Sequence, residues 1–188
     1  MDAEHTALLV MDVQDGVVQR LGDPEMLERT AGAIAAARAA GVRVIYVQVG
    51  FRAGYPEVSA RNRTFAGVAG SGQFVEGEQV RIHESVAPRD GETVVTKRRV
   101  SAFAGSDLDV VLRAGGIVSL VLTGIATSGV VLSTLREAAD LDFELTVLSD
   151  ACADRDDEVH RVLIEKVFPR QAAVLTVAEW AAGLVADG

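Results

Sequence analysis

Two residues of this chain could exchange a proton with a bound molecule, and each directly follows an apolar stretch. Asp12 ends the run Thr6-Ala7-Leu8-Leu9-Val10-Met11, and Lys97 follows the run 92–96, which reads ETVVT. An acid and a lysine at neighbouring strand ends can share a proton or orient one another. We therefore predict that Asp12 and Lys97 are catalytic. The alternative for both Asp12 and Lys97 is an ordinary turn residue exposed to solvent, with no role in catalysis.

A turn of small residues forms a third candidate element of the site. The segment Gly124-Ile125-Ala126-Thr127-Ser128-Gly129-Val130 follows the apolar run 117–123 and opens a helix-like stretch. Such a turn presents backbone N–H groups, which stabilise a developing negative charge.

Further side chains near the strand ends could contact a substrate. Gln48, Phe51 and Arg52 lie at the end of a second apolar run, 42–49, and Phe103 follows Lys97. A guanidinium matches a carboxylate bidentately, and aromatic rings can line a pocket. An ordinary surface arginine and ordinary core aromatics are the alternatives. Gln14 is interpreted as a structural hydrogen-bonding residue.

Cysteine and histidine usage limits the other kinds of chemistry. Cys152 is the only cysteine, which excludes an intramolecular disulfide and a cysteine-rich zinc site. We interpret it as a small buried hydrophobic residue, with a nucleophilic thiol as the alternative. The three histidines are scattered, so we predict neither a metal site nor a cofactor.

Apolar runs alternate with helix-like segments along the chain, and this pattern predicts the elements that position the site. The expected strands are 6–12, 42–49, 92–96, 117–123, 143–149 and 173–175. Continuous apolar strands that alternate with helices predict a parallel sheet covered on both faces. In such folds, ligands bind at the carboxyl ends of the strands, near the point where strand order reverses.

Capping residues and glycines predict where the helices begin and end. Expected helices begin at Asp23-Pro24 and Ser106, span 128–141 and 154–168, and follow the capping box Thr176-Val177-Ala178-Glu179. The first of them ends at Gly41. Residues 50–80 show no period, and we predict a long functional loop that covers the pocket.

The composition of the chain limits the classes of protein to which it can belong. A chain of 188 residues with 49% hydrophobic residues fits one globular domain, 1–188, and excludes intrinsic disorder. With 27 acidic and 18 basic residues, the net charge of −9 argues against a nucleic-acid partner. The chain has neither a membrane-length apolar run nor a recognisable secretory signal, so we expect a cytoplasmic protein without a membrane partner.

The order of these features resembles the isochorismatase-like hydrolase superfamily, also called the cysteine hydrolases. The resemblance runs from about Ala7 to Trp180, and its strongest pieces are Leu9–Gln14, Lys97–Phe103, Thr123–Val131 and Ser149–Asp154. It implies a three-layer, Rossmann-like α/β fold with an open, mostly parallel six-stranded sheet in the order 3-2-1-4-5-6. It also implies a cis peptide at Ile125–Ala126 and a homo-oligomer, a dimer or a tetramer.

The family's amidases use an Asp, a Lys and a Cys, and the resemblance matches the first two with Asp12 and Lys97. It places Val130 where the Cys would be, and valine has no nucleophilic atom. In the isochorismatase branch the residue matching Asp12 donates a proton, and no covalent intermediate forms. Backbone donors near Ala126 and Val130 complete the site that the resemblance implies.

These observations predict a hydrolase for a small-molecule substrate that depends on Asp12 and Lys97 and works without the usual cysteine. Acid-catalysed vinyl-ether hydrolysis, of the isochorismate type, is one reaction that this hydrolase could catalyse. One alternative is a catalytically inactive member that binds a small molecule or serves assembly. A weaker alternative is an amidase acting on a C–N bond, with Cys152 as its thiol.

Overall fold

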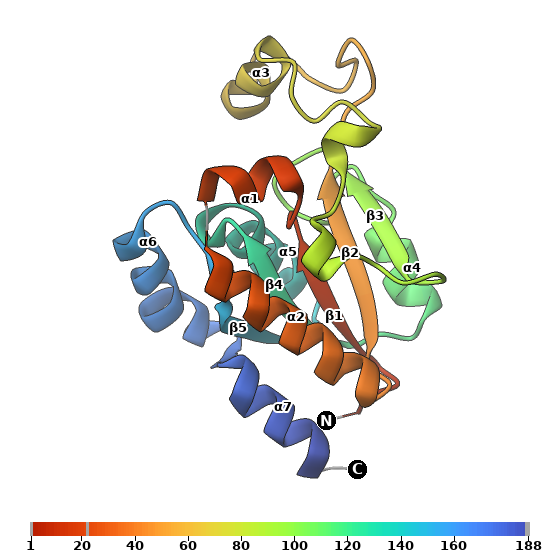
Figure 1. Cartoon of the computed structure of the whole chain (residues 1–188), viewed down its shortest axis with the longest axis vertical. Helices are drawn as coiled ribbons and strands as arrows, with labels where there is room; N and C mark the ends of the chain where they lie inside the picture. The colour runs from red at the N-terminus through yellow and green to blue at the C-terminus, as the bar shows by residue number, and fades with distance from the viewer. Residues whose placement is uncertain (1, 22, 187–188) are drawn as a thin grey trace.

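The computed structural model describes residues 2–21 and 23–186, and its centre is one six-stranded sheet (Figure 1). The strand order is β3-β2-β1-β4-β5-β6, and every neighbouring pair is parallel. The strands are β1 (Thr6–Met11), β2 (Arg43–Val49), β3 (Thr93–Lys97), β4 (Ser119–Ile125), β5 (Glu144–Ala153) and β6 (Ala173–Leu175). The predicted parallel sheet and its order are therefore confirmed.

Helices cover both faces of the sheet, which makes a three-layer α/β/α fold. The helices are α1 (Asp15–Leu21), α2 (Pro24–Ala39), α3 (Arg63–Gly70), α4 (Leu108–Ala114), α5 (Leu132–Asp140), α6 (Asp157–Val162) and α7 (Val177–Ala186). Side chains of α1, α2 and α7 pack in the core on one face, and side chains of α4 and α5 pack on the other. All six residues of β1 are buried, because β1 lies at the centre of the sheet between these layers.

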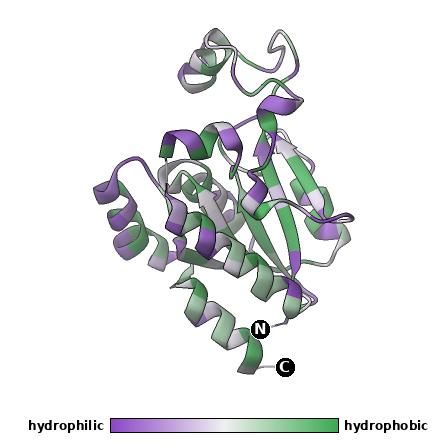
Figure 2. Cartoon of the chain, viewed as in Figure 1, coloured by the Kyte–Doolittle hydropathy of each residue, from purple (hydrophilic) through white to green (hydrophobic). Residues whose placement is uncertain are grey.

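Hydropathy explains this arrangement of layers. Figure 2 shows the strands as mainly hydrophobic, whereas the outer helices carry hydrophilic residues along their length. Among the described residues, no helix has both the length and the apolar character needed to cross a membrane.

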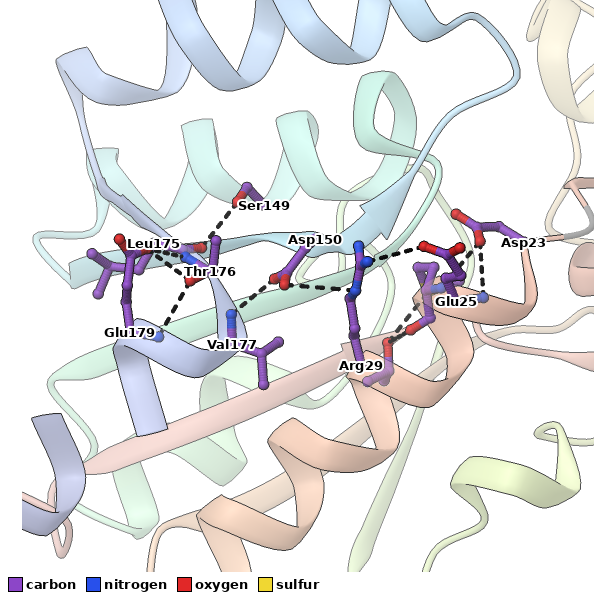
Figure 3. Close-up of polar contacts among 11 residues, drawn as sticks. Asp23, Glu25, Arg29, Ser149, Asp150, Leu175, Thr176, Val177 and Glu179 are labelled. Atoms are coloured by element: carbon purple, nitrogen blue, oxygen red, sulfur yellow. Dashed lines mark hydrogen bonds and ion pairs between the residues drawn. The ribbon is translucent and has the colours of Figure 1, made fainter. Parts of the chain in front are cut away.

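The predicted helix caps are present. The Asp23 carboxylate accepts hydrogen bonds from the N–H groups of Glu25 and Met26, and Pro24 occupies the first turn of α2. At the start of α7, Thr176 Oγ1 accepts from the N–H of Glu179, and Glu179 Oε2 accepts from the N–H of Thr176. This reciprocal pair is the predicted capping box (Figure 3).

Asp150 joins three elements on the same side of the sheet. Its Oδ1 accepts a hydrogen bond of 2.8 Å from the N–H of Val177, and its Oδ2 lies 3.9 Å from Nε of Arg29 (Figure 3). Arg29 also pairs with Glu25 at 3.0 Å. The carboxylate of β5 therefore holds the start of α7 against α2.

Several predicted boundaries differ from the structure. α1 is not among the predicted helices, because its seven residues are too few to show a clear period. The expected loop 50–80 contains α3 and the 3₁₀ turn Glu78–Val80, packed around a small core of their own. This core contains Val49, Phe51, Phe65, Phe74 and Val80. The excursion extends beyond the carboxyl ends of the strands (Figure 1).

Two predicted helices begin or continue irregularly, and one strand is longer than expected. The expected helix 128–141 starts with the π-helical turn Thr127–Val131, which α5 continues. The expected helix 154–168 is divided into α6, the π-helical turn Leu163–Val167 and a 3₁₀ turn, Phe168–Arg170. β5 continues to Ala153 rather than ending at 149, which places Cys152 inside the strand.

One glycine is required where the two central strands end. Gly124 has φ +142°, and a Cβ at this position would overlap the carbonyl oxygen of Met11. We predict that Gly124→Ala lowers the free energy of unfolding by about 3 kcal/mol or more, since neither backbone can move without disturbing the sheet.

Gly32→Ala is the matched control for this substitution. Gly32 lies inside α2, and a methyl group added there would have Cγ1 of Val177 as its nearest neighbour, 4.0 Å away. Alanine at this position should raise the free energy of unfolding by up to about 1 kcal/mol. Urea denaturation of both variants measures the two changes, and equal stabilities would contradict the required close approach.

Candidate active site

Asp12 and Lys97 meet at the carboxyl end of the sheet, as predicted, although they come from strands that are not neighbours. Lys97 ends β3 and Asp12 follows β1, with β2 between them. Neighbouring strands lie about 4.8 Å apart, so the long lysine side chain is needed to cross the intervening strand. Lys97 Nζ lies 2.9 Å from Asp12 Oδ2 and donates a second hydrogen bond of 3.0 Å to the carbonyl of Arg99.

This ion pair is nearly dry. The Lys97 side chain is 3% exposed and the Asp12 side chain is 10% exposed. Within the described residues, Asp12 Oδ1 is buried and has no hydrogen-bond partner. An unpartnered buried oxygen is costly, and such atoms are common where a protein handles a proton or a substrate.

Burial determines the proton affinity of the carboxyl group. Loss of solvent raises the pKa of Asp12 above its usual range, and the nearby Lys97 ammonium opposes this shift only in part. The sequence alone left open which of the two effects is larger. Asp12 therefore holds its proton at a higher pH than an exposed aspartate would.

Gln14 fixes the chain that follows Asp12. Asp12 has φ +57°, a left-handed conformation, and its N–H donates to the carbonyl of Val47 at 2.8 Å. Two residues later, the fully buried Gln14 amide accepts from the N–H of Val49 and donates to the carbonyls of Val49 and Val80. Its predicted structural role is confirmed, and it joins both ends of the excursion 50–80 to the Asp12 turn.

The same excursion is attached a second time, close to Lys97. Arg98 pairs with Glu76, and Arg99 donates a hydrogen bond to the carbonyl of Glu57. Residues close to Asp12 and residues close to Lys97 therefore both bind the excursion 50–80. The position of the excursion is thus coupled to the position of the Asp12–Lys97 pair.

The turn after β4 has an irregular backbone. The cis peptide Ile125–Ala126 is present, as the resemblance implied. The N–H groups of Gly129 and Val131 donate to the carbonyl of Ala126, at 3.0 and 3.3 Å. The N–H of Val130 does not donate to this carbonyl. Donation from the N–H groups of Ala126 and Val130 to a substrate, which the resemblance implied, stays a prediction.

Three of the predicted substrate-binding residues lie on the opposite side of the site, at the end of β2. Phe51 is fully buried and packs on Tyr55 and Phe65, with ring centroids 5.8 and 5.4 Å apart. Arg52 pairs with Glu57 at 2.8 Å, and Gln48 donates to Thr96 Oγ1 at 3.0 Å. All three thus have partners within the chain, and substrate contact by them stays a prediction.

Two of the other three predicted binding residues, Ala126 and Val130, belong to the turn after β4. Phe103 and Val130 are members of the same large apolar core. Ala126 is half-buried and borders a hollow of about 260 Å³, lined by Val17, Arg20, Leu21, Ala126 and Arg155. The structure therefore brings Ala126 and Val130 together in the turn, and their substrate contacts also stay predictions.

Cys152 lies deep in the sheet. It pairs with Gly124 across β4 and β5, is 4% exposed, and has Sγ 3.9 Å from the carbonyl oxygen of Leu122. Burial raises the pKa of its thiol to about 12. A covered thiol that stays protonated at neutral pH favours the interpretation of Cys152 as a small buried hydrophobic residue.

The sequence interpretation missed the contacts that hold the turn after β4. Thr127 Oγ1 lies 2.8 Å from Nδ1 of His160, and Asp154 Oδ2 accepts a 2.7 Å hydrogen bond from the N–H of Ser128. The only available signal was an acidic residue placed directly after a buried strand. Among residues 2–21 and 23–186, no group of three or more His, Cys, Asp or Glu side chains could hold a metal ion.

Removal of one partner from the Asp12–Lys97 pair should lower the free energy of unfolding more than removal of both charges. Lys97→Met leaves a buried carboxyl group without its cation, and we predict a loss of about 3 kcal/mol in the free energy of unfolding. The double variant Asp12→Asn with Lys97→Met should recover part of that loss. Urea denaturation at neutral pH measures both, and strictly additive effects would contradict strong coupling.

Comparison with known proteins agrees with this fold. The Isochorismatase domain model matches residues 6–179. The chain is 35% identical to the isochorismatase family protein YecD of Escherichia coli O157:H7, over 95% of this chain and 96% of that protein. It is 33% identical to the ureidoacrylate amidohydrolase RutB of Stutzerimonas stutzeri, over 94% of this chain and 77% of that protein. An isochorismatase family protein from Burkholderia thailandensis has a similar structure, with TM-score 0.84, 29% identity and coverage of 97% and 96% of the two chains. The chain therefore belongs to the isochorismatase family of hydrolases.

Proposed function

We propose that this protein hydrolyses a small molecule by proton transfer from Asp12, without a covalent enzyme intermediate. The observation that carries the proposal is the dry Asp12–Lys97 pair, in which burial raises the pKa of the acid. Val130 stands where the family resemblance places the nucleophilic cysteine, and it offers no atom for acyl transfer. The proton donor is then the central group of the site.

A vinyl ether is the substrate type that this chemistry fits best. Protonated Asp12 delivers its proton to the terminal carbon of the C=C bond, and the ether carbon becomes an oxocarbenium ion. The oxygen of a water molecule bonds to that carbon, and the water's proton returns to the Asp12 carboxylate. Collapse of the hemiketal breaks the C–O bond and yields a ketone and an alcohol.

Lys97 and the turn contribute electrostatic stabilisation. After the proton leaves, Lys97 Nζ at 2.9 Å stabilises the Asp12 carboxylate. We assign the N–H groups of Ala126 and Val130 to an oxygen that gains negative charge as the hemiketal collapses, as the family resemblance implies. The proposal thus assigns a group to each negative charge that the reaction creates.

A C–N bond is the second candidate target, because one similar protein is named a ureidoacrylate amidohydrolase. In that reaction Asp12 would act as a base that activates water, and the turn would bind the oxyanion of the tetrahedral intermediate. The two candidates assign opposite starting protonation states to the same carboxyl group. In both cases the proposed partner is a small molecule. The family resemblance supports a homo-oligomer, and a cytoplasmic location stays an expectation from the sequence.

A side-by-side hydrolysis screen tests the proposal. The wild type, Asp12→Asn and Cys152→Ala are compared on vinyl ethers including isochorismate, small primary amides, ureido compounds and esters. We expect turnover by the wild type, loss of at least about a hundredfold in Asp12→Asn because the proton donor is gone, and unchanged turnover in Cys152→Ala. Equal turnover by Asp12→Asn, or no turnover by a folded wild type, would reject the proposal, and the second result would favour a binding or assembly role.

The pH profile of kcat separates the two candidate reactions. If Asp12 is the acid, its protonated form is active, so the rate falls as the pH rises through its raised pKa. If Asp12 is the base, the rate falls as the pH decreases through the same pKa. We expect the first profile, and a rate that increases with pH through this region would identify the second reaction.

A further inference from the structure

Two side chains contact the turn after β4: Asp154, which precedes α6, and His160, which lies inside α6. His160 Nδ1 lies 2.8 Å from Thr127 Oγ1, and Thr127 is fully buried. Asp154 Oδ2 accepts the Ser128 N–H at 2.7 Å. Both contacts join residues far apart in the sequence, so they constrain the turn from outside rather than through its own helix.

The Asp154 carboxylate is itself held firmly. Its Oδ1 accepts from the N–H of Arg155 at 2.8 Å, while Oδ2 accepts from Ser128. Burial acts to raise the pKa of Asp154, but the hydrogen bonds that it accepts, chiefly from Ser128, lower the pKa overall. The carboxylate is therefore charged at neutral pH and binds the Ser128 N–H strongly.

The geometry of the turn explains why these contacts matter. The turn is π-helical, so the carbonyl of Ala126 accepts from the N–H of Val131, five residues later. In a regular α-helix the same carbonyl would accept from the N–H of Val130, four residues later. That change would give the Val130 N–H an acceptor and remove it as a donor to substrate.

We propose that His160 and Asp154 are positioning residues that hold this turn in its π-helical form and thereby keep the Val130 N–H from bonding to the carbonyl of Ala126. The inference rests on the proposed function, in which that N–H stabilises charge during hydrolysis. His160 acts through Thr127, and Asp154 acts through the backbone of Ser128. Neither residue needs to touch the substrate.

Matched substitutions at Thr127 test the His160 contact. Thr127→Val keeps the shape of the side chain but removes the hydroxyl, whereas Thr127→Ser keeps the hydroxyl. We expect Thr127→Val to lower kcat at least about tenfold with KM changed less than about twofold, because the lost donor acts in the transition state. Thr127→Ser should retain most of the activity. The substrate is the compound of the hydrolysis screen that the wild type turns over fastest.

Substitutions of His160 and Asp154, the residues that contact the turn, complete the test. His160→Phe should lower kcat as Thr127→Val does, and the two together should be no worse than either alone, since they break one contact. His160→Asn, whose amide can occupy the position of Nδ1, should restore part of the activity. Asp154→Asn should also lower kcat, whereas Asp157→Asn, at an exposed position in the first turn of α6, should not.

Amide hydrogen exchange at Val130 supplies a readout that does not depend on turnover. If the turn changes to α-helical geometry in Thr127→Val, the Val130 N–H gains an acceptor and its exchange slows. Slower exchange together with the kcat loss supports the inference. Unchanged kcat in Thr127→Val and His160→Phe, or a loss of kcat without slower Val130 exchange, overturns it. Equal activity of the wild type and Asp12→Asn rejects the proposed function itself, and this inference with it.

Discussion

The contact between Lys97 and Asp12 depends on the order of the strands more than on either side chain. β2 lies between β1 and β3, so the ammonium group must cross one whole strand to reach the carboxylate. Continuous apolar strands place both groups in a region that water barely enters, and the helices on both faces keep it dry. Exclusion of solvent determines the proton affinity of the Asp12 carboxyl group, because burial raises its pKa even beside a cation.

The turn after β4 begins a helix in π-helical rather than α-helical geometry. The close approach of Gly124 to Met11 brings the end of β4 against the end of β1, beside Asp12. In the π-helical geometry that follows, the carbonyl of Ala126 accepts from the N–H of Val131 rather than from that of Val130. Contacts from Asp154 and His160 hold this geometry from outside the helix.

Local signals in the sequence determined much of the fold. Apolar runs predicted all six strands. The runs are nearly continuous in β1, β2 and β4, because these strands are buried on both faces. Asp23-Pro24 and the Thr176–Glu179 box predicted helix starts correctly, because a cap needs only residues within one turn of each other. The order of the strands and the pairing of Asp12 with Lys97 came from family resemblance and strand-end position, and both are present in the structure.

The tertiary structure decided what depends on residues far apart in the chain. The π-helical turn at 127–131 has no period of its own, and the contacts that accompany it come from residues 154 and 160. The small core of the excursion joins residues 49 and 80, which no local pattern connects. The balance between burial and Lys97 at Asp12 likewise required the packed site. Desolvation depends on every neighbour at once, and a linear sequence does not show which neighbours those are.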